Sequence, residues 1–431
     1  MHQLRLCRLR FGSPGHGDGC EVHFLIHSVE PDTGWSSENH PVYSFVSVVV
    51  SRLLSVLVLV LLTLGSAESQ RFDQIAKNAE KALAEDRAND AVHLYQQALH
   101  LQPSWGEGWW SLGSLLYDQD RFGEAAAAFR HFVALTSKRG PAYAFLGLCE
   151  YETHDYQKAL GHFRSWASLG WPGSRELIDV AAFHFALLLT RDGKFVQALY
   201  LLTPEVVRLG NAPAITEAMG LATLRMRNLP EDYPPERREM VWLAGEAAAY
   251  AEHFPPDYPQ ADEYANRLVS HYGQQPEVHY FRGVLFTFEK KNSSEAAKEF
   301  GEELRISPNH VLAMVELAGL EIGSNHLDEA LSLAKRAIAL EPNNAQAHDA
   351  MGHALLASDR LNESAHELEI AKRLAPASAD IRSHLAMVYG RLGRSREART
   401  EAALSLSLKK KEDVLVPPQE KLKIVEQAEK P

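Results

Sequence analysis

Two consecutive stretches of equal length decide the fold: VLAMVELAGLEIGSNHLDEALSLAKRAIALEPNN (residues 311–344) and AQAHDAMGHALLASDRLNESAHELEIAKRLAPAS (residues 345–378). Placed one above the other, they align Ala330 with Ser364 and Pro342 with Pro376. Apolar residues recur in both at i, i+3, i+4 and i+7, which predicts amphipathic helices. Each proline ends the second helix of its stretch, because proline cannot continue a helix. The unit is therefore predicted to be a helical pair.

The same period runs through most of the chain. Toward the C-terminus, small residues recur every 34 positions at Ala296, Ala330, Ser364 and Ala398, and prolines at Pro308, Pro342 and Pro376. The N-terminal half repeats Ala91, Ala125 and Ala159, each followed four residues later by an aromatic residue: Tyr95, Phe129 and Phe163. A fixed period of this length is typical of solenoids, in which small residues let paired helices approach closely.

On these residues the chain resembles the tetratricopeptide repeat family, whose 34-residue unit carries Trp, Leu, Gly and Tyr in its first helix and Ala, Phe, Ala and Pro in its second. Unit 106–139 matches with Trp109, Leu112, Gly113, Ala125 and Phe129, and unit 345–378 with Met351, Gly352, Leu355, Ser364, Leu368, Ala371 and Pro376. The resemblance covers Phe72 to Glu412. It implies an all-α fold: a right-handed superhelical solenoid of antiparallel helix pairs, with the first helices along the concave face.

The period divides the chain into segments. We predict three repeat units over residues 72–174, degenerate helical repeats with Pro-rich loops over 175–276, four units over 277–412 and a mobile tail over 413–431, in which Gln419–Ala428 has the pattern of a short amphipathic helix. Between Ala159 and Ala198 the spacing is wider than the period, and we assign the excess to the loop Leu169–Ser174. Residues 213–276 fit either a drifted repeat or a bend or partner-binding loop.

The N-terminal part contains an apolar run. Leu53–Leu64 follows Arg52 and precedes small residues up to Ala67, the layout of an export signal. We interpret residues 49–67 as an export signal or a membrane anchor helix, and residues 1–48 as an unstructured extension whose start is misassigned. Both interpretations place residues 68–431 outside the cytoplasm, in a periplasm or anchored at a membrane.

The net charge and the sequence motifs narrow the classes of function that the chain can have. The 44 Lys and Arg against 56 Asp and Glu give a net charge of −12, which disfavours a nucleic-acid partner. Two of the three cysteines precede the export segment, so Cys149 is left as a lone residue at an apolar helix position, expected to be buried. We find no pattern for a catalytic, cofactor or metal site; His366 and Glu367 have the character of solvated helix charges.

The binding residues are expected on the first helices of the early units. Trp110, Tyr117, Phe145 and Tyr151 occupy outward positions there, and aromatic residues are enriched at binding centres. The resemblance also implies carboxylate-binding Lys and Asn pairs in some family members, which this chain lacks. We therefore predict a non-enzymatic scaffold that holds a protein or peptide in its groove. The alternative is an enzyme, or an accessory subunit of one, with a site in residues 213–276.

Overall fold

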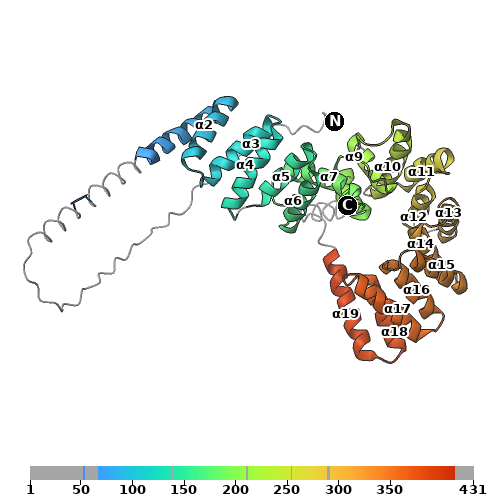
Figure 1. Cartoon of the computed structure of the whole chain (residues 1–431). Helices are drawn as coiled ribbons and strands as arrows, with labels where there is room; N and C mark the ends of the chain where they lie inside the picture. The colour runs from blue at the N-terminus through green and yellow to red at the C-terminus, as the bar shows by residue number, and fades with distance from the viewer. Residues whose placement is uncertain are drawn as a thin grey trace, which may run out of the picture. The chain divides into compact units, whose positions relative to one another are not determined.

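The computed structural model is a succession of α-helices (Figure 1). It describes residues 52–53, 67–137, 139–209, 212–253, 255–288 and 292–412, and no strand occurs in these ranges. Residues 67–84 are helical, followed by α2 (Ala88–Leu101), α3 (Gly106–Asp118), α4 (Phe122–Leu135), α5 (Gly140–Glu152), α6 (Tyr156–Ser168), α7 (Arg175–Arg191), α8 (Phe195–Leu209), α9 (Pro213–Thr223), η1 (Pro235–Arg237), α10 (Arg238–Glu252), α11 (Tyr258–Tyr272), α12 (Val278–Phe288), α13 (Ser293–Ile306), α14 (Val311–Gly323), α15 (Leu327–Leu340), α16 (Ala345–Ala357), α17 (Leu361–Leu374), α18 (Ala379–Arg391) and α19 (Ser395–Glu412). The predicted all-α class is confirmed.

Several predictions concern residues outside these ranges. Residues 1–48 and the tail 413–431 lie wholly outside them, as does most of the apolar run, of which only Arg52 and Leu53 are described. None of the helices in the described ranges combines the length and apolar character that a bilayer crossing requires.

The chain divides into two compact units, Met1–His154 and Asp155–Pro431. Helices α2 to α5 belong to the first unit, and α6 to α19 to the second. Within each unit, the helices pack mainly against their neighbours in sequence, for example α3 on α4 and α16 on α17. Short turns join most of them, so that successive helices run antiparallel.

The repeat period recurs in the geometry of the turns. A residue in the left-handed region follows the first helix of several pairs, at Asp86, Asp120, His154, Gly193, Asn325, Asp359 and Gly393. The next amide closes the helix end: Arg121 N donates to Leu116 O and Arg360 N to Leu355 O, both at 2.9 Å. Asp, Asn and Gly tolerate this backbone conformation better than other residues. The turn therefore ends the first helix of these pairs at an equivalent position.

The small residues of the period lie between the paired helices. Ala91, Ala125, Ala159, Ala296, Ala330 and Ser364 have no exposed surface. At Gly113 a Cβ atom would stand 2.9 Å from the Phe129 ring, so α3 and α4 depend on glycine for this contact. The register assigned from the sequence agrees with this burial.

Residues 213–276 form helices α9, α10 and α11, and the first two make the closest approach. A Cβ atom at Gly220 would meet Val241 O at 1.9 Å, and one at Gly245 would meet Thr216 O at 1.9 Å. The two backbones are therefore in direct contact at both glycines. This packing favours a drifted helical pair over a loosely folded loop.

The connector between α9 and α10, residues 224–237, is folded onto its neighbours. Leu229 and Tyr233 are buried in it. The Arg225 guanidinium stacks 4.6 Å above the Phe195 ring of α8, and its Nε lies 3.7 Å from Glu277 Oε2, beside the start of α12. The connector thus ties the middle helices to those on both sides.

Candidate functional site

The aromatic residues predicted to line a groove gather in one cluster. Trp110 of α3 lies 5.7 Å from Phe145 of α5 between ring centroids, and Tyr117 of α3 lies 5.1 Å from the same ring. Phe145 also stacks on Phe129 of α4 at 5.1 Å. The structure thus brings Trp110, Tyr117 and Phe145 together, at the centre of three packed helices.

Burial limits what this cluster offers to a partner. Phe145 is only 1% exposed and Tyr151, also on α5, is 9% exposed. Trp110 and Tyr117 are half-buried, and burial raises the pKa of the Tyr117 hydroxyl. A partner would reach part of Trp110 and Tyr117 and little of the other two rings. Their role in binding stays a prediction.

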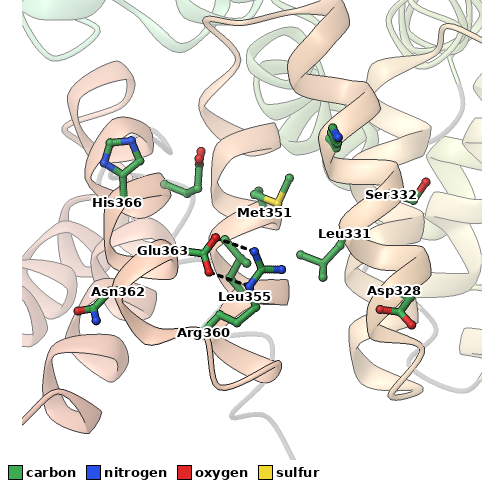
Figure 2. A pocket seen from close by; sticks show the side chains of 11 residues that line it. Asp328, Leu331, Ser332, Met351, Leu355, Arg360, Asn362, Glu363 and His366 are labelled. Carbon is green, nitrogen blue, oxygen red and sulfur yellow. Dashed lines mark hydrogen bonds and ion pairs between the residues drawn. The ribbon is translucent and has the colours of Figure 1, made fainter.

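A cavity of about 680 Å³ lies in the second unit, between α15, α16 and α17 (Figure 2). Leu331, Met351 and Leu355 provide its apolar part. Polar and charged side chains make up the rest: Asp328, Ser332, Lys335, Arg360, Asn362, Glu363, His366 and Glu367. Such a combination suits a ligand with apolar groups that is oriented by polar contacts.

Two interactions fix the α17 side of the cavity. Arg360 forms a forked ion pair with Glu363, from Nε to Oε1 at 2.8 Å and from Nη2 to Oε2 at 2.6 Å, as the dashed lines in Figure 2 mark. This hydrogen-bonded guanidinium lowers the pKa of Glu363. Glu367 contacts His348 Nδ1 of α16 at 2.7 Å, while His348 Nε2 lies 3.0 Å from Pro342 O. Both ring nitrogens of His348 are therefore engaged within the fold.

The sequence contained only a faint signal for this cavity. Its residues come from three helices, and a period of 34 does not show which side chains converge in space. One face of α15 carries residues at i, i+3, i+4 and i+7: Asp328, Leu331, Ser332 and Lys335. This face combines charged, polar and apolar side chains, which by itself does not indicate a binding site. His366 and Glu367, interpreted above as solvated charges, line the cavity.

Another polar group joins α16 to α18. His384 Nδ1 lies 2.7 Å from Asp349 Oδ1, and the His353 ring stacks on the His384 ring at 4.4 Å. Burial opposes the charged form of His384, but the bond to Asp349 outweighs it and raises the pKa of His384. In the described ranges, no three His, Cys, Asp or Glu side chains are placed to hold a metal ion. The contacts of His384 with Asp349 and His353 hold α16 and α18 together.

The acidic residues of the middle region are dispersed. Glu231, Asp232 and Glu236 lie in the connector between α9 and α10, and all three are exposed. Glu239 accepts a hydrogen bond from the Tyr272 hydroxyl at 2.8 Å, and Glu217 accepts one from the Tyr233 hydroxyl at 2.5 Å. Both tyrosines fasten one segment to another: Tyr233 the connector to α9, and Tyr272 α11 to α10.

Comparison with known proteins gives a match over the N-terminal helices. Residues 77–144 match a family model described as a tetratricopeptide repeat. No curated protein matches the chain. Among solved structures, MamA from Desulfovibrio magneticus RS-1 (residues 41 to its end) is 19% identical with a TM-score of 0.34, and the match covers 41% of this chain and 97% of that solved chain. The Cut9–Hcn1 hetero-tetramer of APC/C contains a chain that is 13% identical with a TM-score of 0.36, covering 78% of this chain and 66% of that one.

Proposed function

Because the chain is a tetratricopeptide repeat protein, we propose that it is a non-enzymatic scaffold that binds a protein or peptide partner on its helical surface. The cavity between α15, α16 and α17 carries this proposal. Its volume of about 680 Å³ accommodates a few side chains of a partner. Leu331, Met351 and Leu355 supply apolar surface for them, which is the main source of favourable binding energy in such sites.

The polar residues of the cavity would orient the partner. Lys335 and Asp328 lie on one helix, while Arg360 and Glu363 are held as a pair beside them. A peptide with an apolar anchor residue flanked by charges would therefore meet side chains of both signs. The alternative function, an enzymatic site in residues 213–276, lacks a comparable convergence of groups, since the carboxylates described there are dispersed.

Site-specific photo-crosslinking tests the proposal. A photoreactive residue at Ser332, in the cavity, is expected to form an adduct in an extract of the source cells, and mass spectrometry would identify the partner. Met351→Glu in the same chain should abolish that adduct, because it places a charge on the apolar surface. The matched control carries the photoreactive residue at the exposed Thr400 of α19. Equal labelling from both positions would contradict a site at the cavity.

The aromatic cluster is a second proposed contact surface. It rests on Trp110 and Tyr117 of α3, which are half-buried and so keep some accessible surface. Trp110→Ala should weaken partner capture more than it lowers the thermal midpoint. If Trp110→Ala lowers the thermal midpoint but leaves partner capture unchanged, Trp110 contributes to packing alone.

We also propose that residues 68–431 act outside the cytoplasm. This proposal rests on the sequence, in which the apolar run Leu53–Leu64 is followed by small residues up to Ala67. N-terminal mass analysis of the mature chain tests it. A first residue close to Glu68 would support export with cleavage, whereas a peptide from residues 10–40 in the mature protein would contradict cleavage.

A further inference from the structure

In the second unit, successive helical pairs pack on one another. The groove between α16 and α17 is filled by α18 and α19: the His353 ring stacks on His384 of α18, and Lys372 Nζ lies 3.2 Å from Glu401 Oε1 of α19. Earlier in the unit, Leu304 and Ile338 stand two periods and one period before Lys372, and both pack against a buried core cluster. The positions of His353 and Lys372 therefore face the following pair.

The last described pair, α18 and α19, exposes the equivalent positions. Met387 stands one period after His353, and Leu406 stands one period after Lys372. Met387 is 46% exposed and Leu406 is 64% exposed, the latter among the most exposed large apolar residues described. No described helix covers them. A solenoid requires a polar or covered end, because an open apolar end promotes association.

We propose that residues 413–431 of the same chain fold back and cover the groove between α18 and α19. These residues begin directly after Glu412, the last residue of α19. Pro417 and Pro418 interrupt a helix in the register of the repeat, and Pro418 suits the first turn of a new helix. A ten-residue helix over 419–428 is about 15 Å long, and six preceding residues span about 20 Å when extended, enough to turn back along α19.

The chemistry of the tail matches the groove. Leu422 and Val425 share one face of the predicted helix, and Glu426 lies on the same face at i+4 from Leu422. Glu429 follows the helix directly. On α19, the exposed Arg399 precedes Leu406 by two helical turns and so lies on the same side. Apolar residues would meet Met387 and Leu406, and carboxylates would meet Arg399.

Hydrogen exchange of the full chain tests the proposal. Amides of residues 419–428 are expected to exchange at least about tenfold more slowly than in a synthetic peptide of residues 413–431, because a docked helix protects its amides. Met387→Asp, Leu406→Asp and, in the tail, Leu422→Asp should each abolish the protection. The last change lies outside the repeats, so it leaves their fold intact.

The control is Leu374→Asp on α17, a residue that is 38% exposed and lies outside this groove. It should leave the tail protected. Exchange of the tail at the rate of the free peptide would overturn the proposal. Protection that grows with protein concentration, together with a dimer in light scattering, would identify a second copy as the occupant and overturn it as well.

Discussion

At the scale of single residues, the neighbours of a side chain decide what its replacement does. Gly220 and Gly319 both lie inside helices, where glycine costs about 1 kcal/mol relative to alanine. Gly220 touches the backbone of α10, whereas nothing lies within 4 Å of the Cβ position at Gly319. The same substitution should therefore have opposite effects at the two positions.

Gly220→Ala is expected to destabilise the chain by about 3 kcal/mol or more, because the new methyl group would overlap Val241 O and force α9 away from α10. Gly245→Ala should behave alike, since its methyl group would overlap Thr216 O. Urea unfolding followed by circular dichroism measures both. Gly319→Ala is the control, and it should raise stability by about 0.5–1 kcal/mol. If Gly319→Ala lowered the stability as much as Gly220→Ala, the result would contradict a close backbone contact at Gly220.

The carboxyl group of Glu316 on α14 should make stability depend on pH. Burial raises the pKa of Glu316 in the folded chain, whereas an unfolded glutamate ionises at about 4.3. Between these two values the folded state binds more protons, so stability is fully present below the unfolded pKa and falls as pH rises through the folded one. Glu316→Gln should thus be more stable than the parent at pH 7.5 and nearly equal at pH 4, by thermal unfolding. A difference in stability between the variant and the parent that does not change with pH would contradict the assignment of this pH dependence to Glu316.

At the scale of elements, the helix ends depend on residues from neighbouring helices as well as on local caps. Helix α12 begins after Glu277, which has a φ of +73°. Its first amides bond to α13: Glu303, with no exposed surface, accepts from Glu277 N at 3.0 Å through Oε1 and from Tyr280 N at 3.2 Å through Oε2. The first amides of a helix otherwise lack partners. Glu303 is thus a cap supplied by tertiary structure.

Glu303→Ala is expected to cost about 2–3 kcal/mol, since it removes two hydrogen bonds to a charged acceptor and leaves buried donors unpaired. Glu303→Gln keeps one acceptor oxygen and should cost less. Hydrogen exchange followed by mass spectrometry would locate the effect, which should appear first in the amides at the start of α12. Uniform acceleration across the second unit would argue against a local cap.

At the scale of the molecule, the division at His154 and Asp155 separates two compact units. Within the second, each helix packs mainly on its neighbours in sequence, the arrangement in which stability is a sum over adjacent repeats. Such a unit does not need distant parts of the chain to bury its core.

A fragment of residues 155–412 is therefore expected to fold by itself. Its helical circular dichroism per residue should equal that of the same residues in the full chain, and its unfolding should be cooperative. The comparison fragment starts at residue 213 and so removes α6 to α8, including the Phe195 ring under Arg225; it should unfold at lower temperature. An unfolded 155–412 fragment would show that the boundary does not separate autonomous units.

The sequence by itself determined the features that repeat. The period of 34 predicted the all-α class, the buried positions such as Ala330, and the ends of α13, α15 and α17 before Pro308, Pro342 and Pro376, because these depend on residues close together in one unit. Local spacing is sufficient there, since a helical pair is built from contacts within one repeat and its neighbours.

Only the tertiary structure decided where surfaces form. The sequence marked Phe145 as outward, but the ring packs between Trp110 and Phe129, because aromatic residues of three helices converge there. The cavity of Leu331, Met351 and Leu355 arises in the same way, from residues on three helices whose angles no local pattern specifies. Backbone contact at Gly220 also depends on a partner in the next helix, beyond a long connector. The period sets which side chains can pack, and the angles between helices set which of them remain available to a partner.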